Sequence, residues 1–357
     1  MRIGILTSGG DCAGLNAVMR GFVKAIAATE PKVEIYGIKD GYGGLINKEY
    51  RQIKPEDFSD ILKLGGTILG TSRQSYKKII QKEENDKAEK MKDNYRKMGL
   101  DALIVLGGQG THKTAAFLAE EGLSVIGLPK TIDNDIWGTD LTFGFHSAVN
   151  VATDCIDKVQ TTAASHGRAM VVEIMGNKVG WLTLYAGVAG GADIILIPEI
   201  PYNIDKVIKA AEAAEKQKGF CVIAAAEGAM DEAEAVLSKK ERFQKRSEQG
   251  ERTASNRIAQ AIAGALGIET RVVVPGHIQR GGMPSPYDRV LCTQMGTYAA
   301  KLVKENRFGV SVALDGGKIT CNNLADITGK TKFVPLKHEL IKTAKNIGIS
   351  FGEQCKG

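Results

Sequence analysis

The segment ALIVLGGQGTHK at residues 102–113 joins a continuous apolar run to a glycine-rich turn and then to residues that suit the start of a helix. A strand that is apolar at every position, not at alternate ones, is typical of a parallel sheet covered by helices on both faces. Such a strand ends at the carboxyl edge of its sheet, where ligands of α/β proteins bind. This segment therefore predicts an α/β fold and marks a first candidate ligand loop.

Further runs of the same kind alternate along the chain with segments of helical periodicity. Together with the run at 102–108 they give eight predicted strands: RIGIL (2–6), VEIYGI (33–38), ALIVLGG (102–108), SVIGLP (124–129), AMVVEI (169–174), DIILIP (193–198), CVIAAAE (221–227) and RVVVPG (271–276). Strands that alternate with helices indicate βαβ units and parallel sheets. Because 357 residues exceed one small module, we expect two doubly wound lobes with mostly parallel sheets.

Composition is that of an ordinary globular protein, with 43% hydrophobic residues and a net charge of +6. No apolar run approaches the roughly 20 residues of a spanning helix, and no leader pattern follows Met1, so we expect a cytoplasmic protein without membrane association. The six cysteines are widely spaced, which is typical of reduced thiols and not of a zinc site. The modest positive charge suits anionic small molecules and falls short of a nucleic-acid-binding tail.

Two strongly charged stretches differ from the rest of the chain. Around residues 77–97, apolar residues recur at three- and four-residue spacing among the charges, which predicts an exposed amphipathic helix with a structural role. Residues 230–253 predict a solvated helix or a mobile excursion beside the sheet. Neither stretch supplies a candidate site.

Glycine-rich loops follow two of the predicted strands. TSGGDCAGLN (7–16) leads from the first strand into a helix expected near Leu15, and GGQGTHK (107–113) repeats the arrangement after ALIVL, with Thr111 at the start of its helix. Glycines let backbone N–H groups approach an anion closely, and a helix N-terminus adds partial positive charge. Either loop alone could be only a tight turn, but two of them at adjoining strand ends predict a polyphosphate site.

The segment PKTIDND (129–135) places a lysine, a threonine and two aspartates directly after a buried strand. Asp133 and Asp135 are two residues apart among apolar neighbours, so they can shift each other's pKa or share a cation. One carboxylate could accept a proton from an attacking hydroxyl, and the other could orient Mg²⁺ or the first carboxylate. An Asx turn would explain Asn134 but not Lys130 together with Asp133, so we favour a functional role.

Cationic side chains cluster in three later motifs. They are Arg168 in SHGR, Arg271 in ETR, and His277 and Arg280 in GHIQRGG. Arginine forks match phosphate oxygens, so several of them converging on one spot would indicate a phosphorylated ligand, whereas any one alone could form a surface ion pair. Glu227 ends the strand CVIAAAE, where its carboxylate could accept hydrogen bonds from sugar hydroxyls.

The motifs resemble those of the 6-phosphofructokinases, and they occur in that family's order over almost the whole chain. The matching segments are TSGGD and GLN (7–16), DGYGGL (40–45), GGTILGTSR (65–73), PKTIDND (129–135), VVEIMG (171–176), AGGAD (189–193) and GHIQRGG with PSPYDR (276–289). Residues 308–337 look similar to a somewhat longer bacterial branch that includes both ATP- and pyrophosphate-using members.

The resemblance implies phosphoryl transfer from ATP to the 1-hydroxyl of fructose 6-phosphate, with Mg²⁺ bound. Asp133 would take the proton, Thr131, Asp135 and Arg73 would complete the catalytic set, and Asp135 would be the metal ligand. The implied nucleotide-binding residues are Gly10, Arg73, Gln74, Gly108, Gln109, Gly110 and Thr111. The implied sugar-phosphate residues are Thr131, Asp133, Arg168, Met175, Gly176, Asn177, Glu227, Arg271, His277 and Arg280.

The resemblance also implies how the chain is divided. Residues 1–144 with 279–330 would form the ATP lobe, and residues 145–278 with 331–357 would form the sugar-phosphate lobe. We expect a homo-oligomer, either a tetramer or a dimer, in which Arg168 and Arg271 reach across to a neighbouring subunit.

The phosphate donor depends on two positions. A glycine at the position of Gly110 leaves room for the α-phosphate of a nucleotide, whereas pyrophosphate users of the family carry aspartate there. Lys130 is found in pyrophosphate users but also in ATP users with the same PKTIDND motif. We therefore predict ATP and keep pyrophosphate as the alternative.

The chain departs from the family pattern in three places, and the first two, Gln109 and Asn177, support a second alternative, a catalytically weak sugar-phosphate-binding regulatory paralogue. Gln109 replaces the carboxylate that normally helps hold Mg²⁺, which prefers one or two carboxylates with phosphate oxygens and water. Asn177 replaces an arginine, and Lys178 follows it. Pro55 and Gln160 replace two arginines of the family's effector pocket, which puts the usual allosteric control in doubt.

Overall fold

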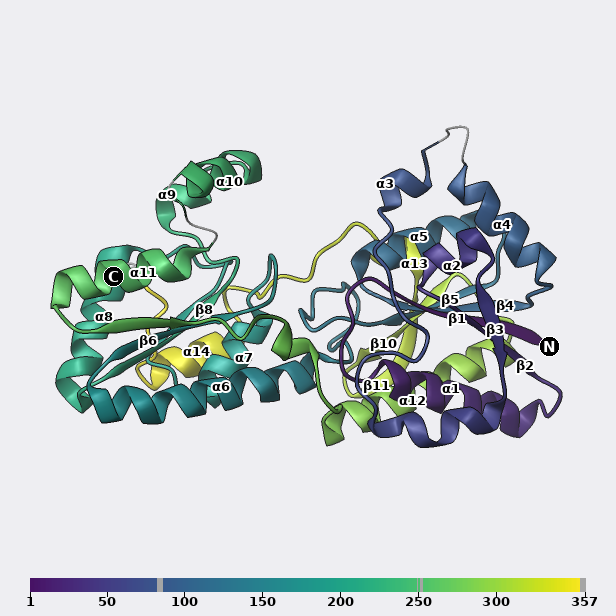
Figure 1. The fold of residues 1–357 in the computed structure, drawn as a ribbon, viewed down its shortest axis with the longest axis horizontal. Coiled ribbons are helices and arrows are strands. Elements are labelled where there is room, and N and C mark those ends of the chain that lie inside the picture. The colour runs from purple at the N-terminus through teal and green to yellow at the C-terminus, as the bar shows by residue number, and fades with distance from the viewer. Residues whose placement is uncertain (82–85, 249, 251–252, 354–357) are drawn as a thin grey trace. The chain divides into compact units, whose positions relative to one another are not determined.

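The computed structural model describes residues 1–81, 86–248, 250 and 253–353. The chain forms two compact units (Figure 1). Unit 1 consists of Met1–Ser147 and Arg280–Lys332, and unit 2 of Ala148–Gln279 and Phe333–Gly357. The chain therefore passes from one unit to the other after residues 147, 279 and 332. The corresponding boundaries expected from the sequence were after residues 144, 278 and 330.

Unit 1 contains a seven-stranded sheet in the order β11-β10-β5-β4-β1-β2-β3. Its strands are β1 (Arg2–Ser8), β2 (Glu34–Ile38), β3 (Tyr50–Ile53), β4 (Ala102–Gly107), β5 (Val125–Pro129), β10 (Val310–Asp315) and β11 (Lys318–Asn323). The five inner strands are parallel, and β3 and β11 pair antiparallel at the two edges. The buried residues of β1, β4 and β5 agree with their continuous apolar sequence.

Helices cover both faces of this sheet, as a doubly wound fold requires. They are α1 (Leu15–Thr29), α2 (Tyr42–Asn47), η1 (Pro55–Lys63), α3 (Tyr76–Ile79), α4 (Lys87–Lys97), α5 (Gln109–Glu120), α12 (Pro286–Lys304) and α13 (Leu324–Ile327). Figure 1 shows α1 and α12 on one face and α2, α4, α5 and α13 on the other. Helices α1 and α12 approach so closely that only glycine fits at position 296. A Cβ there would lie 2.4 Å from the carbonyl oxygen of Val18.

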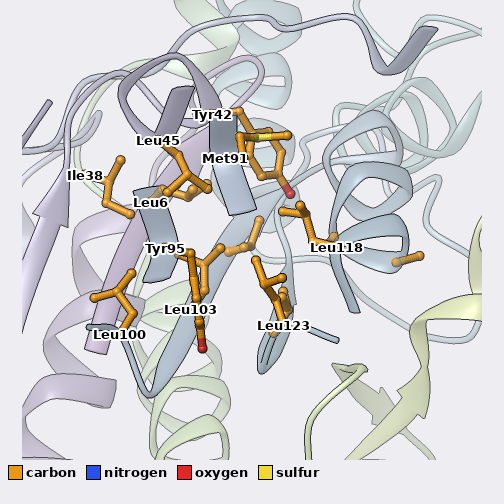
Figure 2. Close-up of a cluster of buried hydrophobic side chains, with 14 of the residues drawn as sticks. Leu6, Ile38, Tyr42, Leu45, Met91, Tyr95, Leu100, Leu103, Leu118 and Leu123 are labelled. Carbon is orange, nitrogen blue, oxygen red and sulfur yellow. The ribbon is translucent and has the colours of Figure 1, made fainter. Parts of the chain in front are cut away.

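The core of unit 1 lies between the central strands and α2, α4 and α5 (Figure 2). Figure 2 shows Met91 of α4 beside Tyr42 and Tyr95 of α4 beside Leu103, so the apolar face of the charged helix is buried as amphipathic spacing predicts. The predicted single helix over 77–97 is, however, two helices, α3 and α4, and residues 82–85 lie outside the described part of the chain. The buried hydroxyl of Tyr42 donates a hydrogen bond to the carbonyl of Thr111 at 2.9 Å, so its burial leaves this polar group with a partner.

Unit 2 contains a fully parallel four-stranded sheet in the order β7-β8-β6-β9. Its strands are β6 (Ala169–Ile174), β7 (Ile194–Leu196), β8 (Cys221–Ala226) and β9 (Thr270–Val273). Its helices are α6 (Phe145–His166), which begins in unit 1, α7 (Trp181–Ala189), α8 (Ile204–Lys218), α9 (Glu232–Ala235), α10 (Lys239–Glu248), α11 (Ala254–Leu266), η2 (Gly276–Arg280) and α14 (Glu339–Asn346). Helices α8 and α11 pack on one face, and Figure 1 shows α6, α7 and α14 on the other.

The described residues of the charged stretch at 230–253 form α9 and α10 and are mostly exposed, as predicted, but a buried ion cluster anchors them. Glu234 is fully buried and accepts hydrogen bonds from Arg246 at 2.8 and 2.7 Å and from Arg257 at 3.1 and 2.9 Å. Burial by itself would favour the neutral acid, but the two guanidinium groups outweigh it and lower the pKa of Glu234 to about 2. The charged sequence thus reflects internal pairing as well as a solvated face.

All eight predicted strands are present, so the predicted α/β class with mostly parallel sheets is confirmed. Strands β3, β10 and β11 were not predicted. No helix in the described ranges is long and apolar enough to span a bilayer.

Candidate active site

Three adjacent strands, β1, β4 and β5, end at the carboxyl edge of the unit 1 sheet. Each is followed by one of the candidate loops: the glycine-rich loop at 9–14 after β1, Gly108 after β4, and the loop at 130–142 after β5. Because these strands are parallel neighbours, the loops lie side by side where α/β sheets bind ligands.

The loop after β1 is fixed by hydrogen bonds to residues 71–72. The Gly9 N–H donates to the carbonyl of Ser72 at 3.0 Å, and the Thr71 hydroxyl donates to the carbonyl of Gly9 at 2.8 Å. Gly9 itself has a φ of 90°, in the left-handed region that favours glycine. These bonds hold the following residues, Arg73 and Gln74, at the same edge of the sheet.

Two cationic side chains adjoin this loop within unit 1. A Cβ added to Gly10 would lie 2.8 Å from a guanidinium nitrogen of Arg280, so that side chain rests against the loop. The ammonium of Lys130 donates to the carbonyl of Gly10. Lys130 is 4% exposed, and this burial lowers its pKa, while the carboxylate of Asp133 acts in the opposite direction.

The loop after β4 forms the first turn of α5. Thr111 donates its hydroxyl to the carbonyl of Ser8 at 3.4 Å, which links the two glycine loops. A Cβ added to Gly110 would meet no atom within 4 Å, so this position faces open space. The N–H groups of this first turn have no intrahelical acceptor and suit an anion.

The imidazole of His112 links the start of α5 to β10. Its Nδ1 lies 3.0 Å from the carbonyl of Gly108, and its Nε2 lies 2.9 Å from the hydroxyl of Ser311. Complete burial lowers the pKa of His112 to about 4, so the ring is neutral at physiological pH. Because a carbonyl can only accept, Nδ1 carries the proton and Nε2 accepts from Ser311.

The loop after β5 presents the two candidate carboxylates. The hydroxyl of Thr131 accepts a hydrogen bond from the Asp133 N–H at 3.0 Å. Between the carboxylates, Asn134 adopts the left-handed conformation with a φ of 53°, and its Oδ1 accepts from the Thr142 N–H at 3.0 Å. Asp133 and Asp135 both remain partly exposed at the sheet edge.

Gln109 contacts Asp135 directly. Its Nε2 lies 2.9 Å from Oδ2 and 2.9 Å from the backbone oxygen of Asp135, and 3.2 Å from the Thr331 hydroxyl. The neutral amide therefore donates to Asp135, where a second carboxylate would repel it. The described residues contain no cluster of three side chains that could hold a metal by themselves. One carboxylate is nevertheless enough for Mg²⁺ when phosphate oxygens and water supply the other ligands.

In unit 2, four residues of the predicted sugar-binding set follow the carboxyl ends of β6 and β8: Met175, Gly176, Asn177 and Glu227. Oε1 of Glu227 accepts hydrogen bonds from the N–H groups of Asn177 at 2.7 Å and Gly176 at 3.3 Å. Both residues have positive φ, 149° for Gly176 and 53° for Asn177, so the turn is sharp. The Met175 N–H donates to Oε1 of the buried Gln279 at 3.2 Å, which fixes the other side of the turn.

Arg168 and Arg271 converge on one carboxylate. Nε of Arg168 lies 2.7 Å from Oε2 of Glu269, and Arg271 pairs with the other oxygen. The hydrogen bond from Arg168 is the main cause that lowers the pKa of Glu269. His277, also in unit 2, is exposed on η2.

A cavity of about 430 Å³ opens beside the Asn177 turn of unit 2. It is lined by Asn177, Lys178, Pro198, Glu199, Gly228, Met230, Arg242, Arg246 and Phe333. The sequence interpretation missed Glu199, although this residue follows a predicted strand and so carried the same signal as Glu227. Arg242 carried no such signal, because it lies in a charged helix far from any strand end.

Comparison with known proteins was consistent with these motifs. The sequence model of the family described as Phosphofructokinase matches residues 2–303. An ATP-dependent 6-phosphofructokinase of Spirochaeta thermophila is 51% identical over 356 residues, covering 98% of this chain and 97% of that protein. ATP-dependent 6-phosphofructokinase 3 of Bacteroides thetaiotaomicron is 45% identical over 354 residues, covering 99% and 100% of the two chains.

Solved structures give the same relationship. Pichia pastoris phosphofructokinase superimposes with a TM-score of 0.79 at 31% identity over 91% of this chain, which spans only 35% of the yeast chain's length. A pyrophosphate-dependent phosphofructokinase of Marinobacter aquaeolei gives a TM-score of 0.81 at 21% identity, covering 99% and 89% of the two chains. At that identity the second likeness supports the fold alone.

Proposed function

The chain belongs to the phosphofructokinase family, and from this premise we propose that it transfers a phosphoryl group from ATP to the 1-hydroxyl of fructose 6-phosphate in the cytoplasm. The product would be fructose 1,6-bisphosphate, formed in glycolysis. The observation that carries the proposal is the loop of Asp133 at the same sheet edge as two linked glycine loops. An acceptor base beside two phosphate cradles is what phosphoryl transfer needs.

Asp133 is the proposed proton acceptor. Its carboxylate would take the proton of the attacking hydroxyl, and Thr131 would hold the Asp133 backbone in place through the bond at 3.0 Å. The reaction requires positioning and neutralisation of spread charge more than covalent chemistry. Lys130 and Arg280, both beside Gly10, supply positive charge at this edge.

The donor would be held by the glycine loops, whose residues are Gly10, Arg73, Gln74, Gly108, Gln109, Gly110 and Thr111. Backbone N–H groups of these loops would bind the phosphates, and the open space at Gly110 suits the α-phosphate of a nucleotide. Asp135 would bind Mg²⁺ together with phosphate oxygens and water, and bound Mg²⁺ neutralises charge on the phosphates. Gln109 already donates to Asp135, so the nucleotide would supply most of the remaining ligands.

The sugar phosphate would be bound by Met175, Gly176, Asn177 and Glu227, with Arg168, Arg271, His277 and Arg280 on its phosphate. Arg168 and Arg271 share Glu269 in the free protein, so a phosphate would have to compete with that carboxylate. Arg280 rests against Gly10 and would have to leave it. Arg168 and Arg271 lie at the amino ends of the parallel strands β6 and β9, whereas Met175 and Glu227 follow the carboxyl ends of β6 and β8. We therefore propose a homo-oligomer in which Arg168 and Arg271 serve the site of a neighbouring subunit.

The test is an assay of fructose 1,6-bisphosphate formation by the purified full chain, with ATP or pyrophosphate at matched Mg²⁺. We expect ATP to be preferred. Asp133→Asn should lower kcat by about 10²- to 10⁴-fold without lowering the melting temperature, because it removes only the base. Asp315→Asn, which changes an exposed carboxylate at the end of β10 in the same unit, is the matched control and should keep near-normal turnover.

Each other outcome has a definite meaning. A preference for pyrophosphate would mean that ATP is not the donor. Lys130 would then be a better indicator of the donor than Gly110. Binding of fructose 6-phosphate without product from either donor would favour the regulatory paralogue. Near-normal turnover in Asp133→Asn would remove the proposed base.

A further inference from the structure

A short segment near the end of unit 1 braces the loop that carries Asp133. The segment is Thr331–Lys332, which lies almost 200 residues further along the chain. Thr331 forms a β-bridge with Ile136, and the Lys332 N–H donates to the carbonyl of Asp135 at 2.9 Å. This strap therefore runs along the loop and is attached to it by its own backbone.

The ammonium group of Lys332 binds three oxygens of the loop. Nζ lies 2.9 Å from Oδ1 of Asn134, 2.8 Å from the carbonyl of Thr139 and 2.8 Å from the carbonyl of Asp140. A protonated amine offers three donors and no acceptor, which matches three acceptors grouped in one place. Hydrogen bonds from a charged donor are also stronger than neutral ones.

The bonded oxygen of Asn134 is the critical one. Asn134 separates Asp133 from Asp135 and has a φ of 53°, a conformation that reverses the local chain direction and orients the two carboxylates. Its Oδ1 accepts from Lys332 and from the Thr142 N–H, and its Nδ2 donates to the carbonyl of Asp140 at 3.3 Å. The conformation between the two aspartates is thus held by its side chain, and that side chain is held by Lys332.

We propose that Lys332 is a positioning residue for the reaction, which fixes the direction of the Asp133 carboxylate through Asn134. This inference rests on the proposed function, in which Asp133 is the base. It assigns to Lys332 no contact with substrate. The backbone bonds of Thr331 and Lys332 attach the strap independently of the ammonium, so we expect the strap to stay in place when the ammonium is removed.

Kinetics of the full-length enzyme test the proposal. Lys332→Met keeps the length of the side chain but removes the donors, and we expect kcat to fall about 10²-fold, since a misplacement of about 1 Å costs that much. KM for ATP should change less than about threefold, because the glycine loops are not touched. Lys332→Gln keeps an amide donor and should recover at least about tenfold of the loss.

Lys330→Met is the matched control, since Lys330 is exposed two residues earlier on the same segment. It should keep the wild-type kcat. If Lys332→Met also keeps it, or if kcat falls only in proportion to the folded fraction measured by circular dichroism, the proposal is overturned.

Hydrogen exchange separates this inference from the proposed function. The Thr142 amide is bonded to Asn134, so exchange measured by mass spectrometry over residues 131–142 should be at least about tenfold faster in Lys332→Met than in Lys330→Met. If the wild-type enzyme makes no fructose 1,6-bisphosphate, the proposed function fails, and the exchange rates still judge the strap. If the enzyme is active and exchange is unchanged, the strap role alone fails.

Discussion

Replacing Gly110 with aspartate should remove ATP as a donor without damaging the fold. Gly110 is the second residue of α5, whose first turn holds no acidic residue. A Cβ there meets nothing within 4 Å, and no positive φ restricts the position to glycine. Aspartate is also a better helix residue than glycine and interacts favourably with a helix N-terminus, by about 0.3–1 kcal/mol. We therefore expect the melting temperature to stay the same or rise.

The effect on the donor follows from charge and space. Two charges separated by about 5 Å repel each other by about 3 kcal/mol at an effective dielectric constant of about 20, which is the effect expected if the α-phosphate of ATP binds beside this position. That energy corresponds to about a 10²-fold loss in kcat/KM for ATP. Pyrophosphate has no α-phosphate beyond the loop, so its weak use should fall less or even increase.

Gly110→Asn separates the two causes, because asparagine fills the same space without charge. We expect it to lose about tenfold or less in kcat/KM for ATP, measured beside Gly110→Asp at the same free Mg²⁺. The reasoning is refuted if Gly110→Asp keeps ATP use within threefold of wild type. If Gly110→Asn loses as much as Gly110→Asp, space alone is the cause and the electrostatic argument is wrong.

Three further predictions concern other parts of the two units. Gln109→Glu keeps the shape of the side chain and places a second carboxylate about 3 Å from that of Asp135, so the metal-free melting temperature should fall by a few degrees. The Mg²⁺ concentration for half-maximal activity should fall about tenfold, and unchanged metal dependence would contradict this. Glu234→Gln leaves Arg246 buried without its counter-charge and should lower the free energy of unfolding by about 3 kcal/mol at pH 7. Because the pKa of Glu234 is lowered to about 2, the stability difference between wild type and Glu234→Gln is complete above about pH 4.5 and should vanish as pH falls through 2. Urea unfolding at several pH values measures this difference, and a difference that does not change with pH would contradict the prediction. Gly176→Ala puts a Cβ 2.5 Å from a backbone carbonyl oxygen at a φ of 149°, so KM for fructose 6-phosphate should rise about tenfold with KM for ATP unchanged, and equal changes in both would count against it.

The sequence by itself determined the strands and their class. Continuous apolar runs such as ALIVLG at β4 can be read locally, because a strand buried on both faces needs apolar side chains at every position. The same rule placed Asp133 and Glu227 at strand ends, where parallel strands leave room for ligands. Three strands were not predicted by this rule. Three of the four residues of β3 are exposed and β11 is only partly buried, so neither edge strand needs an apolar pattern. The inner strand β10 is buried, but the polar Ser311 interrupts its apolar run.

Only the tertiary structure decided which polar groups meet. Gln109 and Asp135 are 26 residues apart, and Lys332 and Asn134 are 198 apart, yet each pair is joined by a hydrogen bond of 2.9 Å. The ion cluster of Glu234 likewise buries Glu234 and Arg246 within a segment that is otherwise mostly exposed. A hydrogen bond depends on a few tenths of an ångström and on direction, whereas hydrophobic burial depends on area and has no direction. Burial can therefore be predicted from the local sequence, whereas the hydrogen-bond partners of polar side chains depend on how distant segments pack.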